Sequence, residues 1–226
     1  MKILITLGGT AEALDGVRFI TNFSSGATGS FIADELTKSG HKVKALCSKN
    51  AKVLPGLCEK LLYSDFKSLD ELIRRTLKEE NFHLIIHLAA VSDFSPVSIT
   101  CAGREIRPGE EKKIPSDAEE MTVNLRRNFK IVNRLKDYAS NKPAVAAFKL
   151  TNGAAQEEAR KAALKVEGAD FVVHNDLSEH TSKERKFTFY KQGFKQKICP
   201  LRKFAKYIAA LHSVPCLHCN SLQITA

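Results

Sequence analysis

The sequence predicts an α/β protein with a Rossmann-like three-layer fold, built on a mostly parallel sheet and extended by a C-terminal β-hairpin. Short apolar runs alternate with segments of helical periodicity along most of the chain, which is typical of βαβ units. The run at 83–91, HLIIHLAAV, is apolar almost throughout, as expected of a parallel strand that is buried on both faces. Near the C-terminus, Lys-Gln-Gly separates two β-type runs at 186–190 and 194–198, which predicts the hairpin.

The individual elements follow from the same patterns. Strands are predicted at 2–7, 41–48, 83–91, 121–125, 144–150 and 170–174. Helices are predicted at 26–39, 68–80, 128–138, 154–166 and 200–211. Ser68 and Glu71 have the spacing of a capping box for the second helix, and Pro200 stands in the first turn of the last one. Residues 93–120 show no clear periodicity, so we expect a long functional or mobile loop there.

Length, charge and cysteine content narrow the class of protein. The 226 residues are enough for one domain at 1–211, followed by a tail at 212–226 that we interpret as disordered. The net charge is +10, but the basic residues are spread out and no nucleic-acid motif accompanies them, so we expect an anionic substrate and no nucleic acid. With no long apolar run and no signal peptide, we expect no membrane partner, a cytoplasmic location and reduced cysteines.

Two loops rich in glycine and serine could hold phosphate groups. Gly9 and Thr10 follow the first strand, where glycine lets backbone N–H groups approach an anion and Thr10 adds a hydroxyl. Ser24, Ser25 and Gly26 lead into the first helix, whose N-terminus attracts negative charge. A simple tight turn is the alternative for the first loop, and a serine N-cap for the second. The first loop has neither the spacing of a dinucleotide fingerprint nor that of a P-loop.

More polar residues stand at strand ends, where ligands bind in open parallel sheets. Arg18 and Asn22 cluster just before the serine loop. Ala89 and Ala90 are small enough to let a planar ring or a ribose come close, and Asp93 could then bind a sugar hydroxyl or a metal. The alternative for Asp93 is a strand cap. We expect these segments to converge in one anion-lined cleft.

Three further groups are weaker candidates. Lys113, on the long loop, could close over phosphates as a point charge. Lys161 and Lys165 are four residues apart and share one face of a predicted helix. Asn175 and Asp176 follow a strand and could recognise a substrate amide. A solvated surface is the alternative for the lysines, and a turn for the Asn-Asp pair.

Taken together, these motifs resemble those of the phosphopantothenate–cysteine ligases of coenzyme A biosynthesis. The matching segments are GGT-x-E, D-x-VR-x-IT-N-x-SSG-x-x-G, AAVSDF, K-I-x-S, AFKL and NDL, in order between Lys2 and Tyr190. The resemblance implies one nucleotide-binding ligase domain at 1–211 and a homodimer. Many relatives carry a flavin-dependent decarboxylase domain before the ligase, whereas this chain starts at the first strand of the ligase, so we expect a separate decarboxylase.

The resemblance also implies a two-step reaction. The carboxylate of 4'-phosphopantothenate attacks the α-phosphate of CTP, which gives an acyl-cytidylate and pyrophosphate. The amine of cysteine then attacks the acyl carbon and releases CMP. Mg²⁺ would neutralise the triphosphate, with no metal site expected among the protein's own side chains. ATP is the alternative nucleotide, because the sequence departs from many relatives at Pro115-Ser116 and Leu150-Thr151.

Individual roles follow from the same resemblance. Asn22 matches the asparagine that holds the acyl-nucleotide intermediate, and Lys113 matches the loop lysine that clamps it, so these are the expected catalytic residues. The ring of Phe148 would face the base. The expected nucleotide-binding residues are Gly9, Thr10, Ser24, Ser25, Gly26, Ala89, Ala90, Asp93, Phe148, Lys161 and Lys165. The expected substrate-binding residues are Arg18, Asn175 and Asp176.

Two other functions compete with this interpretation. The first is an NAD(P)-dependent reductase of Rossmann type. The sequence argues against it, because it lacks G-x-G-x-x-G and its second strand ends in Cys-Ser and not in an acidic residue. The second is a zinc-binding tail formed by His212, Cys216, His218 and Cys219. Four ligands within so short a segment leave little chain to enclose a tetrahedral metal.

Overall fold

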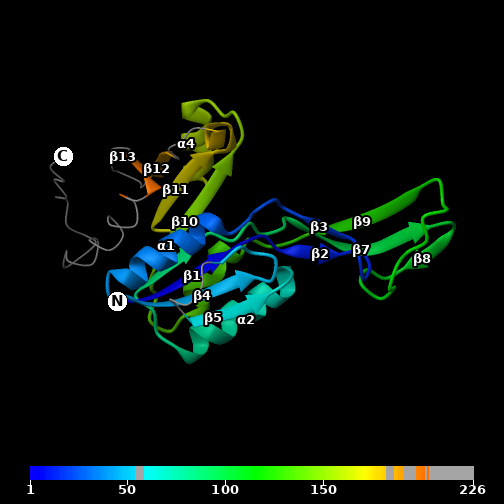
Figure 1. Cartoon of the computed structure of the whole chain (residues 1–226), viewed down its shortest axis with the longest axis horizontal. Coiled ribbons are helices and arrows are strands. Elements are labelled where there is room, and N and C mark those ends of the chain that lie inside the picture. Colours follow the sequence, from blue (N-terminus) through cyan, green and yellow to red (C-terminus); the bar gives the residue numbers. More distant parts are fainter. Residues whose placement is uncertain (54–58, 182–185, 191–196, 202, 204–226) are drawn as a thin grey trace.

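The computed structural model describes residues 1–53, 59–181, 186–190, 197–201 and 203. Within these ranges the chain forms an α/β body and a long β-rich arm that projects from one side of it (Figure 1). The arm leaves the body where β1 and β6, two central strands, reach their carboxyl ends. The tail predicted at 212–226, and the predicted last helix beyond residue 203, lie outside the described residues.

The body is built on one eight-stranded sheet in the order β13-β12-β11-β10-β6-β1-β4-β5. Its strands are β1 (Lys2–Leu7), β4 (Lys42–Ser48), β5 (Glu59–Tyr63), β6 (Leu84–His87), β10 (Ala144–Thr151), β11 (Phe171–Asp176), β12 (Lys186–Tyr190) and β13 (Lys197–Pro200). The pairs from β5 across to β11 are parallel, whereas β12 and β13 pair in the antiparallel sense. The α/β class, the mostly parallel sheet and the antiparallel C-terminal pair are therefore confirmed.

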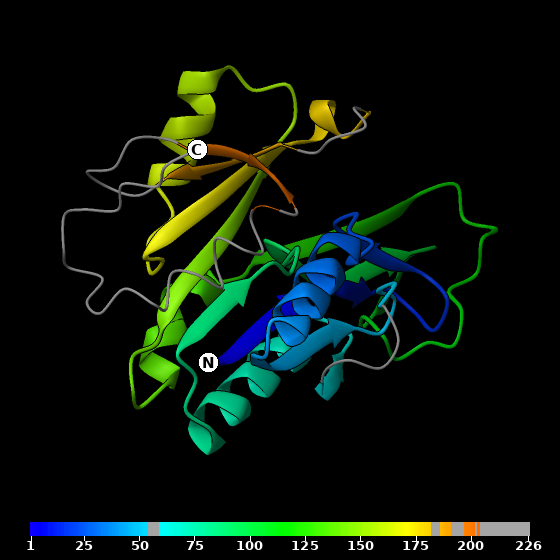
Figure 2. The same ribbon diagram turned by 60° about the vertical axis from the view of Figure 1, so that its left-hand side comes forward.

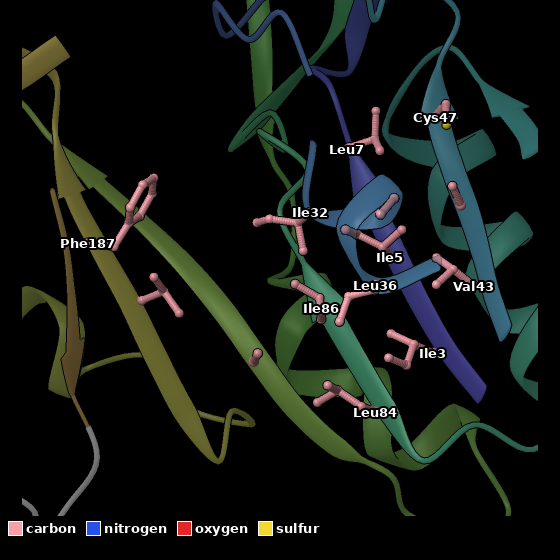
Figure 3. Packing of buried hydrophobic residues seen from close by; sticks show 14 of the residues in the cluster. Ile3, Ile5, Leu7, Ile32, Leu36, Val43, Cys47, Leu84, Ile86 and Phe187 are labelled. Carbon is pink, nitrogen blue, oxygen red and sulfur yellow. The ribbon is translucent and has the colours of Figure 1, made fainter. Parts of the chain in front are cut away.

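Helices cover both faces of this sheet, as right-handed βαβ crossovers require. On one face α1 (Ala27–Lys38) lies over β1 and β4 (Figure 2). Its residues Ile32 and Leu36 pack with Ile3, Ile5 and Leu7 of β1 (Figure 3). The other face carries α2 (Phe66–Glu79), α3 (Leu135–Tyr138) and α4 (Gln156–Leu164). Two 3-10 turns, η1 (Ile131–Arg134) and η2 (Leu177–Thr181), complete the helical elements of the described residues.

The arm consists of a short hairpin, β2 (Ala11–Ala13) with β3 (Phe19–Thr21), and a three-stranded antiparallel sheet in the order β8-β7-β9. These three strands are β7 (Phe94–Cys101), β8 (Arg104–Ile106) and β9 (Met121–Arg127). Leu14, Ile99, Cys101, Ile106 and Ile114 form a small core of the arm's own. The prediction of an irregular loop over 93–120 is therefore wrong for the residues that form β7 and β8. Because β7 buries only two of its eight residues, it offers no sustained alternation to recognise.

Three smaller predictions need correction. β5 was not expected, and the helix predicted at 128–138 is reduced to η1 and one turn of α3. The N-cap of α2 is Asp65, whose carboxylate accepts from the Ser68 N–H at 2.8 Å while the Ser68 hydroxyl accepts from the Asp65 N–H at 3.0 Å. The capping box therefore joins Asp65 to Ser68 and not Ser68 to Glu71, because Asp65 directly precedes the buried Phe66 that opens the helix.

Candidate active site

The loops that follow β1 and β6 are tied to each other. Gly9 and Ala90 form an isolated parallel bridge, and the Thr10 N–H donates to the Ala90 carbonyl at 3.1 Å. The Thr10 hydroxyl donates to the Ser92 hydroxyl at 2.8 Å and accepts from the Ser92 N–H at 2.9 Å. Since Thr10 is fully buried, its hydroxyl holds the two loops together. A direct contact of Thr10 with phosphate stays a prediction.

Asn22 lies at the same edge of the sheet. Its side-chain Nδ2 donates to the Val91 carbonyl at 3.1 Å, and its own carbonyl would lie 2.5 Å from a Cβ placed on Gly9. A larger residue at position 9 would clash with this carbonyl, so only glycine lets the loop after β1 approach the Asn22 segment this closely. Asp93 is two residues beyond Val91, so Asn22 and Asp93 share one edge of the molecule. The expected convergence of the loops after β1 and β6 is confirmed.

A cavity of about 590 Å³ opens next to this junction, on the face of the sheet that carries α4. This volume is typical of small-molecule sites. Its walls come from the ends of β6 and β10, from the segments 91–93 and 129–133, and from α4 with the residues that follow it. Five predicted nucleotide-binding residues line it: Ala89, Asp93, Phe148, Lys161 and Lys165. Val91 also lines the cavity, which places the Asn22 amide at its rim.

Positive charge gathers at the mouth of this cavity. Lys161 on α4 and Lys165 directly after it are exposed, and Lys149 from β10 is half-buried. These three have no ion-pair partner in the described part of the chain, whereas Lys130 pairs with Asp93. The acidic lining residues Glu158 and Glu167 offset part of this charge. An arrangement of unpaired lysines around an open pocket is suited to a polyphosphate.

Phe148 does not present its ring as expected. Neighbouring residues of a strand point to opposite faces of a sheet, and the Phe148 ring packs with the core under α1. There it meets Phe187 of β12 edge to face, with the ring centroids 6.2 Å apart. A stacking role for this ring stays a prediction, and the geometry gives it no support.

His87 at the end of β6 lines the cavity and was missed. Its Nδ1 lies 2.9 Å from the Thr6 hydroxyl of β1, and burial lowers the pKa of the imidazole to about 4. The ring is therefore neutral at physiological pH. The only signal in the sequence was one titratable side chain inside an otherwise apolar strand, a position that is more often explained by core packing.

The predicted residues Ser24, Ser25 and Gly26 do not line the cavity. They lie at the N-terminus of α1, on the opposite face of the sheet. The N-cap is Gly26, with φ 74° and no side-chain cap, so the alternative of a serine N-cap is wrong. A Cβ on Gly26 would approach Ala51 Cβ to 2.8 Å, which is why only glycine fits this turn. Phosphate binding here stays a prediction.

Arg18 and Lys113 lie on the arm. The Asp15 carboxylate accepts from the Arg18 guanidinium and, at 2.9 Å, from the Ile114 N–H, while Arg18 also donates to the Ile114 carbonyl. The Arg18 hydrogen bonds, followed by the Ile114 N–H, hold the pKa of Asp15 well below its usual range. Lys113 is thus next to an anchored residue, at the far end of β3 from Asn22. Four steps of extended chain, about 13 Å, lead from Arg18 to Asn22.

Asn175 and Asp176 lie at the end of β11, away from the cavity lining. The buried Asp176 carboxylate accepts from Ser178, Thr151 and the backbone N–H groups of Gly153 and Ala154. The hydrogen bonds from Ser178 and Thr151 depress the pKa of Asp176 far below its usual value. Asp176 therefore fixes the turn after β10, and substrate binding by this pair stays a prediction.

The described residues offer neither a metal-binding cluster nor a membrane-spanning helix. The described residues contain no group of three or more His, Cys, Asp or Glu side chains arranged to hold a metal ion. The Cys/His segment of the tail lies outside the described ranges. Among the described helices, none combines the length and apolar character needed to cross a bilayer.

Comparison with known proteins gives a consistent family. The family model described as "DNA/pantothenate metabolism flavoprotein C-terminal domain" matches residues 1–211. The coenzyme A biosynthesis bifunctional protein CoaBC of Thermococcus kodakarensis is 30% identical over 208 residues, which cover 89% of this chain and 48% of the relative. The protein of the same name from Escherichia coli K12 is 25% identical over 181 residues, with coverages of 80% and 42%. The chain thus spans about half the length of these relatives.

Solved structures support the same grouping. The DNA/pantothenate metabolism flavoprotein from Streptococcus pneumoniae aligns with a TM-score of 0.80 at 26% identity, covering 94% of this chain and 98% of that one. The C-terminal domain of a coenzyme A biosynthesis bifunctional protein CoaBC aligns with a TM-score of 0.68 at 25% identity, covering 93% of each chain. Both alignments include the body and extend over nearly the whole chain.

Proposed function

The chain belongs to the family of the DNA/pantothenate metabolism flavoprotein C-terminal domain, and on that basis we propose that it is a phosphopantothenate–cysteine ligase of coenzyme A biosynthesis. The observation that carries the proposal is the cavity at the carboxyl ends of β6 and β10. It is lined by residues expected to bind a nucleotide, and its rim holds Asn22. No observation favours the reductase alternative.

The proposed reaction joins 4'-phosphopantothenate to cysteine at the expense of CTP. A carboxylate oxygen of phosphopantothenate attacks the α-phosphorus of CTP, and the bond to the β-phosphate breaks to release pyrophosphate. The cysteine amine then attacks the acyl carbon of the resulting acyl-cytidylate, loses a proton, and displaces CMP. Neither step needs a covalent bond to the enzyme, so positioning and charge stabilisation supply the catalysis.

The described side chains divide this work between them. Lys149, Lys161 and Lys165 balance the charge of the triphosphate at the mouth of the cavity. Mg²⁺ commonly binds through phosphate oxygens and water, which is compatible with a site without a cluster of acidic ligands. Asn22 donates from its amide to the oxygen that gains charge as the acyl carbon is attacked, after releasing the Val91 carbonyl.

The arm supports the proposed homodimer. Large apolar side chains are exposed along it, which is unusual for a surface that meets only water. They come from the β2–β3 hairpin, from the segment that follows it and from both long strands of the antiparallel sheet: Val17, Phe19, Ile20, Phe23, Phe94, Val97, Met121 and Leu125. A second copy of the chain would bury them, and Lys113 lies on this same arm. We therefore propose that the two chains meet through their arms and that Lys113 acts at the site of the partner chain.

A pyrophosphate-release assay tests the proposed function. Purified protein is supplied with CTP, Mg²⁺, 4'-phosphopantothenate and cysteine, and each component is omitted in turn. We expect pyrophosphate only when phosphopantothenate is present, and CMP only when cysteine is added as well. A parallel titration with ATP decides the nucleotide. Pyrophosphate release that does not depend on phosphopantothenate would contradict the proposal. The reaction uses small water-soluble compounds, which agrees with the cytoplasmic location that we propose.

A further inference from the structure

The buried lining of the cavity carries no charge, and its polar side chains are the ring of His87 and the hydroxyl of Ser92, which accepts from Thr10. His87 and Ala147 face each other across β6 and β10, and both are at least nine-tenths buried. Ala89 lines the cavity next to them. The lysines of the mouth are much more exposed, so the cavity is polarised, with a neutral inner end and a cationic opening.

The protonation pattern of His87 follows from its neighbour Thr6. The Thr6 hydroxyl is fully buried, and its partners are the Ala89 N–H at 3.2 Å and His87 Nδ1 at 2.9 Å. An N–H group can only donate, so the hydroxyl accepts from Ala89. A buried hydroxyl must also place its own proton, and Nδ1 is the acceptor within reach. His87 Nδ1 is therefore unprotonated, and the ring proton of the neutral imidazole is on Nε2.

The Nε2–H group of His87 has no acceptor within the described part of the chain. Fully enclosed side-chain nitrogen and oxygen atoms of the described residues all have a partner, so this nitrogen must be open to the cavity that the ring lines. The imidazole stays neutral near physiological pH because burial lowers its pKa to about 4. The inner end of the cavity thus presents the His87 Nε2–H as an uncharged donor in a fixed tautomer.

We propose that His87 is the residue that recognises the nucleobase, through a hydrogen bond from Nε2–H to an acceptor atom of the base. This inference rests on the proposed function, in which the cavity holds a nucleoside triphosphate. The polarity of the cavity places the uncharged base at the inner end and the phosphates at the lysines. Cytosine offers O2 and N3 as neighbouring acceptors. A base that turns an N–H group toward His87 would leave two donors facing each other and would be rejected.

Calorimetric titrations of the full chain test this assignment. Wild type and His87→Phe are titrated with CTP, with CMP and with inorganic pyrophosphate, all with Mg²⁺. Phenylalanine keeps a ring of similar shape but cannot donate. We expect CTP and CMP to bind about ten-fold more weakly to His87→Phe, with pyrophosphate binding unchanged. Lys161→Gln is the matched variant at the mouth, and it should weaken CTP and pyrophosphate with little effect on the base contact.

A second variant and a spectroscopic measurement distinguish loss of the base contact from misfolding of His87→Phe. Thr6→Val removes the hydroxyl that fixes the tautomer and accepts from the Ala89 N–H, but it keeps the His87 ring, so it should weaken CTP and CMP less than His87→Phe does. In wild type, ¹⁵N NMR should show His87 protonated on Nε2, with that resonance shifting when CMP is added. Equal CTP affinity in wild type and His87→Phe, or an Nδ1-protonated ring, would overturn the assignment. If wild type binds no nucleotide at all, the proposed function fails instead.

Discussion

The body and the arm use β-structure in opposite ways. The central strands of the body are covered on both faces, and side chains such as Ile3, Leu4 and Ile86 are completely buried. The arm encloses only a small core around Ile99 and Ile114, and it exposes many other large apolar side chains. The central strands of the body are therefore covered within the single chain, whereas the arm has the surface of an element that packs on something else.

This difference also divides the proposed active site. The cavity and its lysines belong to the body, where strand ends and α4 hold them in place. Asn22 lies at the junction, between the last residue of β3 and the start of α1. Lys113 belongs to the arm, where Asp15 anchors its neighbour Ile114. One chain thus supplies the proposed nucleotide site, and the lysine proposed to be catalytic lies apart from it on the arm.

The largest expected effect concerns the junction. Asn22→Asp places a negative charge where charge develops during acyl transfer, and it should lower kcat by about 10²–10³-fold. The measurement is steady-state pyrophosphate release, with the melting temperature as a check of folding. Asn81→Asp, at an exposed asparagine that accepts from Ser140, is the matched control and should keep full activity. Full activity of Asn22→Asp would remove Asn22 from the mechanism.

A mixing experiment tests whether arm and body cooperate across chains. Asn22→Asp and Lys113→Gln are each expected to be nearly inactive as pure dimers. If Lys113 serves the partner chain, a mixed dimer has one intact site, and random mixing should restore about a quarter of wild-type activity. The measurement is activity after the two variants are unfolded and refolded together. No recovery, in preparations where mixed dimers are demonstrated, would place Lys113 at the site of its own chain.

The exposed surface of the arm should control association. Val97→Ser with Leu125→Ser removes two apolar side chains that are 40% and 45% exposed in the single chain. We expect the double variant to shift from dimer toward monomer in light scattering over a dilution series, because these groups would be buried between copies. Leu62→Ser, at a 61% exposed leucine on edge strand β5 of the body, is the control and should leave the mass unchanged. A monomeric wild type would contradict the proposed interface.

The smallest expected effect compares one carboxylate in each region. Hydrogen bonds depress the pKa of Asp15 in the arm and of Asp176 in the body below the unfolded value of 3.8. Each ionised carboxylate therefore stabilises the fold above about pH 4, and this contribution is lost as the pH falls further. Asp15→Asn and Asp176→Asn should both lower the melting temperature at pH 7, with a smaller difference from wild type near pH 3. A pH-independent difference would show that the charge is not responsible.

Sequence reasoning worked best where side chains are buried on a regular period. The strands at 2–7 and 144–150 and the helix at 154–166 were recognised because burial imposes a pattern on their residues. β7 and β8 were not, since most of their side chains face solvent or a proposed partner. For the site, Ala89, Asp93, Lys161 and Lys165 all line the one cavity, and their binding of a nucleotide stays a prediction.

Other site residues could not be placed from sequence because their positions depend on contacts across long distances in the chain. The hydrogen bond from Arg18 to Ile114 joins residues 96 positions apart in the sequence, and the hydrogen bond between Thr6 and His87 joins residues 81 positions apart. Neither pair has a local signature. His87 in particular looks like a packing residue until Thr6 and the cavity are seen beside it.

The most direct test of the central claim is a crystal structure with CTP and Mg²⁺ bound. Our account predicts the triphosphate among Lys149, Lys161 and Lys165, its α-phosphate toward Asn22, and the base at His87. A nucleotide bound elsewhere on the chain, with this cavity empty, would contradict it.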